Sequence, residues 1–121
     1  MREGRKELGF TGEELAVKYL RKRGYKILER NYRCPLGEID AVALKDGFLV
    51  FVEIKTRRTS LFGPPQEAVD ARKRKKLKHL ALHYLSEKRL GERLPLRFDV
   101  VAVDLSRGEP SVELIPDAFE T

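Results

Sequence analysis

The sequence predicts an α/β domain in which a central mixed sheet of about five strands is flanked by helices, in the order α β β β α β β. Two segments carry apolar residues at helical spacing, whereas the others alternate or are almost continuously apolar, as strands are. The second helical segment lies between two strands and forms a crossover. With 121 residues and 41% hydrophobic content, the chain suits a single domain, 1–121, whose ends at 1–7 and 117–121 we expect to be loose.

The first helix is expected to begin at Thr11, because Thr11 and Glu14 form a capping-box pattern, and to stop at Gly24. Its apolar face contains Ala16, Val17 and Leu20. Glu13 precedes these three residues by three, four and seven positions and therefore lies on the same face. A carboxylate in the first turn complements the helix dipole. Alternatively, Glu13 reaches over the sheet toward the acidic residues of the hairpin that follows.

The centre of the sheet is predicted to be a β-hairpin of residues 37–45 and 48–56, preceded by a first strand at 25–33. The intervening dipeptide Asp46-Gly47 favours a type I′ turn. Apolar residues occupy both faces of the hairpin, which is typical of strands that are covered on both sides. The pairing depends on the turn, because a three-residue loop would shift the register by one residue.

Four charged side chains are expected on one face, at the end of the hairpin away from the turn. With a two-residue loop, Asp40 lies directly opposite Glu53. Glu38 then lies opposite Lys55. Opposed carboxylates about 5 Å apart repel each other by roughly 3 kcal/mol at an effective dielectric near 20, and a divalent cation such as Mg²⁺ would offset this repulsion. The alternative is a cross-strand ion pair between Glu38 and Lys55, with the other two carboxylates reaching solvent.

Basic residues follow the hairpin in two places. Arg57 and Arg58 lie in a loop of about ten residues that leaves the charged end of the hairpin, where they could contact phosphates. A mostly helical segment, 66–88, then carries a basic run at 72–78, which is either a solvated helix face or a phosphate-contact surface. The basic residues of this run are Arg72, Lys73, Arg74, Lys75, Lys76 and Lys78.

Three further residues are auxiliary candidates for the site, namely Glu38, Gln66 and Asp99. Asp99 interrupts an almost continuously apolar strand at 96–104, which suggests a central strand covered on both faces. There it either pairs with Arg97 or another basic residue, or assists the site. A last short strand is expected at 112–115.

The composition favours a basic, reduced, cytoplasmic protein that binds a polyanion. The net charge of +6 and the pI of about 9.6 point first to nucleic acid. Cys34 is the only cysteine, which excludes a disulfide framework and a cysteine zinc site. No apolar run could span a membrane or serve as a signal peptide. A charged content of 36% with a single Asn and a single Gln resembles the composition of thermophile proteins.

Several motifs resemble the bacterial YraN-like family, and the match covers nearly the whole chain. They are Leu8-Gly9, Gly12-Glu13-x-x-Ala16, Gly24-Tyr25, Arg30-Asn31-Tyr32-Arg33, Gly37-Glu38-Ile39-Asp40, Phe51-Val52-Glu53-Ile54-Lys55-Thr56-Arg57 and Arg97-Phe98-Asp99. The hairpin, with an Asp followed after twelve residues by Glu-x-Lys, resembles the PD-(D/E)xK nuclease pattern, with Ile39 in place of its proline. In this core, YraN-like proteins resemble archaeal Holliday-junction resolvases.

The resemblance implies a restriction-endonuclease-like fold and a metal-dependent DNA endonuclease that hydrolyses phosphodiester bonds in DNA repair or recombination. Asp40 and Glu53 would be the ligands of Mg²⁺ or Mn²⁺, and Lys55 would be the catalytic lysine. Glu13 would be a helix-borne acid that reaches the metal directly or through water. Because little in the chain could read bases, we expect cleavage of branched or junction DNA by structure, for which a homodimer would be suited.

Two other functions fit the same basic surface. A non-catalytic module would bind nucleic acid without cutting it, since the fold also hosts such proteins. An accessory subunit would instead dock its basic helix on an acidic protein partner. Cleavage of DNA, DNA binding without cleavage, and failure to bind DNA distinguish the three functions.

Overall fold

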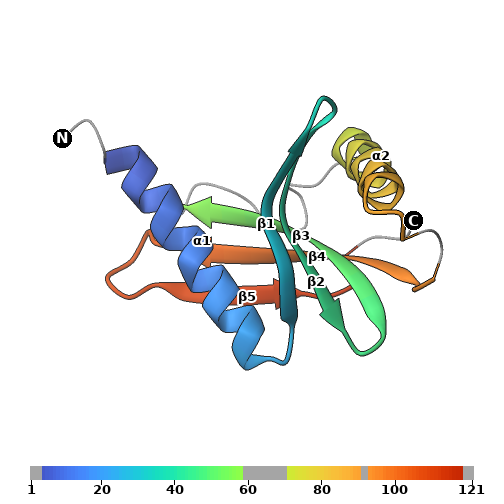
Figure 1. Ribbon diagram of the computed structural model, residues 1–121. Coiled ribbons are helices and arrows are strands. Elements are labelled where there is room, and N and C mark those ends of the chain that lie inside the picture. The colour runs from blue at the N-terminus through green and yellow to red at the C-terminus, as the bar shows by residue number, and fades with distance from the viewer. Residues whose placement is uncertain (1–3, 59–70, 91–92, 119–121) are drawn as a thin grey trace.

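The structure is a computed structural model that describes residues 4–58, 71–90 and 93–118. A five-stranded mixed sheet in the order β1-β2-β3-β4-β5 is flanked by two helices (Figure 1). The elements are α1 (Gly4–Lys22), β1 (Lys26–Cys34), β2 (Gly37–Lys45), β3 (Phe48–Arg57), α2 (Ala71–Glu87), β4 (Leu96–Asp104) and β5 (Ser111–Ile115). This is the predicted α/β fold in the predicted order, and it is consistent with a restriction-endonuclease-like fold.

The hairpin of β2 and β3 forms as its turn residues predict. Asp46 and Gly47 have φ angles of 51° and 83°, and positive values at both positions are those of a type I′ turn. Antiparallel pairing starts beside this turn and continues as far as Ala41 and Val52. The register is therefore that of a two-residue loop, as the sequence indicated.

The next strand pair is parallel, which explains the helical crossover between its strands. β3 and β4 pair from Leu49 and Leu96 at one end to Arg57 and Asp104 at the other. β1 and β5 form the two edges of the sheet and pair antiparallel with β2 and β4. β4 thus has a neighbour on each side and is buried on both faces, as its apolar sequence predicts.

The sheet buries one hydrophobic cluster on each face. The cluster under α2 includes Tyr32, Ile39, Val42, Phe51, Leu77, Leu80, Tyr84 and Phe98. The cluster under α1 includes Ala16, Leu20, Tyr25, Ala41, Val50, Val52 and Val101. Simple alternation would place Ile39 and Ala41 on one face, yet they belong to different clusters. The regular alternation of faces along β2 is therefore interrupted between these two residues, at Asp40.

Helix α1 starts earlier than its capping pattern predicts. It begins at Gly4, and Thr11 lies inside it, so the assignment of Thr11 as the N-cap is wrong. The good helix formers Arg5, Lys6, Glu7 and Leu8 precede Thr11, and each residue added to an existing helix gains a hydrogen bond, so the helix extends past the pattern toward the N-terminus. The predicted stop at Gly24 is confirmed, because its φ of 89° allows the Tyr25 N–H to donate to the Leu20 carbonyl at 3.0 Å.

Gly12 lets α1 lie directly against β3. A Cβ placed on Gly12 would come within 2.9 Å of Thr56 Cγ2 and closer still to Thr56 Oγ1. We expect Gly12→Ala to lower the free energy of unfolding by about 1–3 kcal/mol through overpacking, despite the better helix propensity of alanine. Urea unfolding measures this change. Gly108→Ala is the matched control, because a Cβ on Gly108 meets nothing within 4 Å; equal stability of the two variants would contradict the close contact.

The C-terminal residues are tied to β4 as far as they are described. The Asp117 N–H donates to Asp99 Oδ1 at 2.9 Å, and the Ala118 N–H donates to the Phe98 carbonyl at 2.8 Å. Residues 1–3, 59–70, 91–92 and 119–121 lie outside the described residues, and Gln66 is among them. Within the described part of the chain, neither helix has the length and apolar character needed to cross a membrane.

Candidate active site

β2 and β3 separate at a fork, the point beyond Ala41 and Val52 where their backbone pairing ends. From there, β2 continues beside β1 and β3 continues beside β4. Asp40 lies at the fork, and its Oδ2 accepts a hydrogen bond of 2.7 Å from the backbone N–H of Ile54. A side-chain carboxylate thus satisfies a backbone donor at the place where the strands no longer pair with each other.

Asp40 and Glu53 form a carboxylate pair at this fork. The pKa of Asp40 is raised to about 7, chiefly by burial and then by the charge of Glu53, although the hydrogen bond from Ile54 lowers it. A hydrogen bond between the two carboxyl groups and the charge of Glu13 raise this pKa further. Glu53 itself is only 7% exposed. The sheet therefore holds a half-buried Asp40 and a buried Glu53 side by side, and a cation between them would relieve their repulsion.

Two lysines contact the same oxygen of Glu53. Lys55 Nζ lies 3.5 Å from Glu53 Oε2, and Lys73 Nζ lies 2.6 Å from it. Burial lowers the pKa of Lys73, but the hydrogen bond and the charge of Glu53 outweigh burial, so that this pKa is raised and the ammonium stays charged. The site therefore combines two carboxylates with two ammonium groups, one from β3 and one from α2.

The contact of Lys73 with Glu53 was not predicted, because Lys73 was assigned to the basic run at 72–78. The spacing of apolar residues in the sequence nevertheless indicates its position. Lys73 precedes Leu77 by four residues and Leu80 by seven, and both leucines are buried on α2. This spacing places Lys73 on the same face of the helix, at the end of the buried stripe nearest the carboxylate pair.

Glu38 is not brought to Lys55. The register of β1 and β2 sets Glu38 opposite Arg33, and Arg33 Nε donates to Glu38 Oε2 at 2.6 Å on an exposed surface. The fork explains the difference, because β2 has already left β3 at this position and faces β1 instead. Neither predicted role of Glu38, as partner of Lys55 or as metal ligand, is therefore supported.

Asp99 has partners that do not belong to the carboxylate pair. It is 1% exposed and accepts hydrogen bonds from the Tyr25 hydroxyl at 2.6 Å and from Arg97 Nε at 3.0 Å. The Asp117 N–H donates to the same carboxylate. These contacts support the structural alternative, in which Asp99 is the buried partner of Arg97.

Glu13 approaches the carboxylate pair from α1. Its neighbour Gly12 is buried against Thr56, one residue after Lys55, which holds this turn of the helix close to the site. Glu13 is half-buried, and its charge helps to raise the pKa of Asp40. Among the described residues, no three His, Cys, Asp or Glu side chains gather closely enough to hold a metal ion. An ion at the fork would therefore be held by Asp40 and Glu53, with Glu13 at longer range.

The basic run forms an exposed surface at the start of α2. Its exposed members are Arg72, Arg74, Lys75, Lys76 and Lys78. Lys76 lies over the start of β2, where a Cβ on Gly37 would come within 3.0 Å of Lys76 Cε. Arg57 is half-buried at the end of β3, and the adjacent Arg58 is exposed. The predicted basic surface thus borders the carboxylate pair through Lys73, which belongs to the same helical turn as Arg72 and Arg74.

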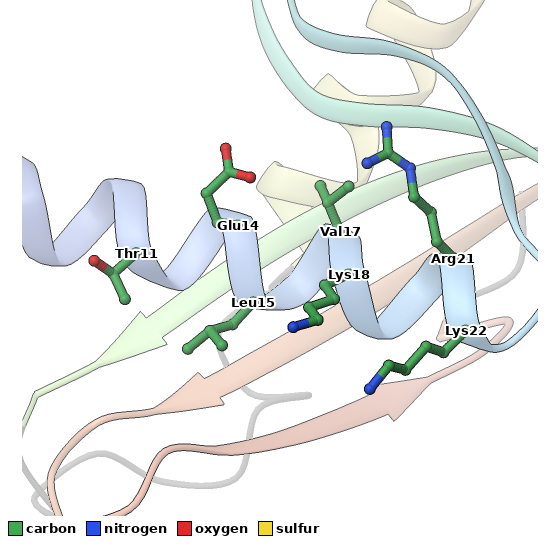
Figure 2. A pocket seen from close by; sticks show the side chains of 7 residues that line it. All are labelled: Thr11, Glu14, Leu15, Val17, Lys18, Arg21 and Lys22. Carbon is green, nitrogen blue, oxygen red and sulfur yellow. The ribbon is translucent and has the colours of Figure 1, made fainter.

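A separate hollow of about 670 Å³ runs along α1 (Figure 2). It is lined by Thr11, Glu14, Leu15, Val17, Lys18, Arg21 and Lys22. Glu14 also makes an ion pair of 2.8 Å with Arg30 of β1. None of the residues of the carboxylate pair lines this hollow, so we assign the candidate chemistry to the fork.

Comparison with known proteins identifies the family of this chain. Residues 12–103 match the family model described as "Uncharacterised protein family UPF0102". A UPF0102 protein of Moorella thermoacetica is 52% identical over 117 residues, which cover 95% of this chain and 97% of the relative. Relatives from Syntrophotalea carbinolica and Geobacter metallireducens are 50% and 48% identical, covering 96% and 95% of this chain and 94% and 93% of their own lengths. The chain therefore belongs to the UPF0102 family, which is the YraN-like family that its motifs indicated.

Proposed function

We propose that this protein is a metal-dependent endonuclease that hydrolyses DNA phosphodiester bonds, with a preference for branched or junction DNA. One observation carries the proposal: Asp40 and Glu53 lie side by side at the fork, with Lys55 Nζ 3.5 Å from Glu53 Oε2. This is the set of groups that the PD-(D/E)xK resemblance assigns to metal binding and catalysis. Substrates of this kind arise in DNA repair and recombination, and we propose that the protein acts in these processes in the cytoplasm.

The carboxylate pair suits Mg²⁺ or Mn²⁺. Mg²⁺ is usually held by one or two carboxylates together with several waters, and a pair of carboxylates is what the fork provides. Burial and the charge of Glu53 raise the pKa of Asp40, and a divalent cation would favour its charged form. When bound, the ion would supply Lewis-acid polarisation of the scissile phosphate.

The other residues of the site have roles that follow from their charge and position. Lys55 orients the attacking water or stabilises the charge that develops on the phosphate in the transition state. Arg72, Arg74 and Lys75 hold backbone phosphates, so that affinity for DNA falls steeply with salt. Contacts to phosphates position DNA but read no bases, and this supports selection by the structure of the DNA rather than by its sequence.

The exposed basic face of α2 also supports the two rival functions. A nucleic-acid-binding module without activity would use the same cations and leave the carboxylate pair without a chemical role. An accessory subunit would use them to dock on an acidic protein. Both rivals leave unexplained why two carboxylates are held together at a buried fork, at a position where one of them has a raised pKa.

We expect the wild-type protein to cut a four-way junction or a flap in the presence of Mg²⁺ or Mn²⁺. Asp40→Ala and Lys55→Ala are expected to lower the cleavage rate by at least about 100-fold, because Asp40 would hold the metal ion and Lys55 would compensate charge in the transition state. Cleavage is measured on labelled junction, flap and linear duplex DNA, with EDTA as the blank.

The same assay separates the rivals. DNA binding without cleavage by all three proteins supports the binding module. Failure of the wild-type protein to bind DNA at low salt supports the protein-partner function. Equal cleavage by the wild type and both variants would show that a contaminating nuclease is responsible and would contradict the proposal.

A further inference from the structure

We propose that the Lys73 ammonium group changes partner when a divalent ion binds. Without an ion it pairs with Glu53, and when an ion takes its place it contacts a DNA phosphate instead. The inference rests on the proposed function, because it assumes an ion at the carboxylate pair and DNA on the basic surface. It adds a coupling between the two: binding of the ion releases a positive charge that DNA can use.

The contact of Lys73 with Glu53 and the binding of an ion compete for one oxygen. Lys73 Nζ lies 2.6 Å from Glu53 Oε2, and Lys55 Nζ lies 3.5 Å from the same atom. The Glu53 side chain is only 8% exposed, so there is little free surface on this carboxylate. An ion that takes Glu53 Oε2 as a ligand must therefore displace the ammonium group that is closest to it.

The charges of the site explain why one lysine must leave. Two ammonium groups, Lys55 and Lys73, already lie beside Glu53 Oε2. A divalent ion adds two positive charges in the same place, and like charges at this range repel strongly where water is scarce. Release of one ammonium group removes part of this repulsion.

Lys73 is the lysine that can leave. Lys55 lies on β3 only two residues from Glu53, in a strand that is paired with β4. The Lys55 and Lys73 side chains are about equally exposed, at 36% and 35%. What distinguishes Lys73 is that it comes from α2 and lies beside the exposed basic residues of that helix. Its neighbours Arg72 and Arg74 are exposed, so the phosphates that they would hold lie within the same reach.

Among the described residues at the start of α2, Arg72, Lys73 and Arg74 are basic and none is acidic. The pairing with Glu53 accounts for Lys73 in the absence of an ion. A phosphate accounts for Lys73 together with Arg72 and Arg74.

The first test is the affinity of the free protein for Mn²⁺ and for Ca²⁺, measured by calorimetry without DNA. Lys73→Met removes the competing ammonium and should tighten binding of either ion by at least about tenfold. Lys75→Met is the control, because Lys75 is exposed on the same helix, and it should leave both affinities nearly unchanged. Unchanged affinity in Lys73→Met, or no ion binding to either the wild type or this variant, overturns the exchange.

The second test is the salt dependence of binding to a DNA junction, in EDTA and in saturating Ca²⁺. In EDTA, the wild type and Lys73→Met should show the same slope of log affinity against log salt, because Lys73 is held by Glu53. In Ca²⁺, the wild-type slope should be steeper than that of Lys73→Met by about 0.9, the value for one phosphate contact. The difference in slope between the wild type and Lys75→Met should be the same in EDTA and in Ca²⁺.

The outcomes separate this inference from the proposed function. A slope difference for Lys73→Met that is equal in EDTA and Ca²⁺ overturns the exchange, even if the wild type cuts DNA. An ion-dependent slope difference without any cleavage by the wild type supports the exchange and contradicts the nuclease proposal.

Discussion

Asp99→Ala is expected to lower the free energy of unfolding by about 3–5 kcal/mol, the range found when one partner of a buried ion pair is removed. Asp99 is 1% exposed, and Arg97, whose side chain is 14% exposed, donates to its carboxylate at 3.0 Å. The Tyr25 hydroxyl donates to the same carboxylate at 2.6 Å, and burial raises its pKa, so the proton stays on Tyr25. Removal of Asp99 leaves the charge of Arg97 and the hydroxyl of Tyr25 without the carboxylate that they contact. Urea unfolding at pH 7 measures the change.

Two further variants control for this result. Tyr25→Phe removes one hydrogen bond to Asp99 and should lower the free energy of unfolding by only about 1 kcal/mol. Asp99→Leu combined with Arg97→Leu removes both charges and should be more stable than Asp99→Ala, because no buried charge is left alone. A loss below about 1 kcal/mol in Asp99→Ala would show that the network is not the structural element that its contacts indicate. Loss of cleavage without loss of stability would instead support the alternative that Asp99 assists the site.

Asp40→Asn is expected to remove a pH dependence of stability that the wild type shows in EDTA. The pKa of Asp40 is raised to about 7 in the folded protein from its ordinary value of 3.8. Between these two values the folded state holds a proton that the unfolded state has lost, so the free energy of unfolding falls as the pH rises. From pH 5 to pH 8 this group should lower wild-type stability by about 2–3 kcal/mol. The Asn side chain keeps an oxygen that can accept the hydrogen bond from the Ile54 N–H, but its amide group does not ionise.

The measurement is urea unfolding at pH 5 and pH 8 for the wild type and Asp40→Asn. Glu38→Gln is the matched control, because Glu38 is an exposed carboxylate on the same strand, paired with Arg33, and its removal should change stability by less than about 1 kcal/mol at either pH. Addition of Mg²⁺ at pH 8 should raise the free energy of unfolding of the wild type and leave that of Asp40→Asn unchanged. If the wild type and Asp40→Asn lose the same free energy of unfolding between pH 5 and pH 8, Asp40 is not the group responsible.

Local chemistry made most of the fold predictable. The Asp46-Gly47 turn determines the hairpin register, and the apolar run of β4 indicates a strand with neighbours on both sides. The start of α1 was missed because the capping pattern at Thr11 is a local signal, whereas whether a helix ends there depends on the residues before it. Caps and turns are short-range features, and they predict structure well only where nothing nearby competes with them.

The candidate site was predictable in part. The hairpin register brings Asp40 near Glu53 and places Lys55 on the face of Glu53. The fork was not predictable, because it depends on which strand β2 and β3 each follow after they separate, and these contacts involve residues far apart in the sequence. This is why Glu38 was directed toward Lys55 and instead pairs with Arg33.

The hydrogen bond between Asp40 and Ile54 constrains how this carboxylate can meet an ion. Oδ2 accepts from the backbone of β3, which uses one of the two lone pairs of this oxygen. A bidentate contact, which is common in the larger, more flexible shells of Ca²⁺, would require the ion to share Oδ2 with this backbone donor. The backbone that keeps the strands together also sets the angle at which that oxygen is presented. Selectivity for a small octahedral ion would in this way be a property of the sheet itself.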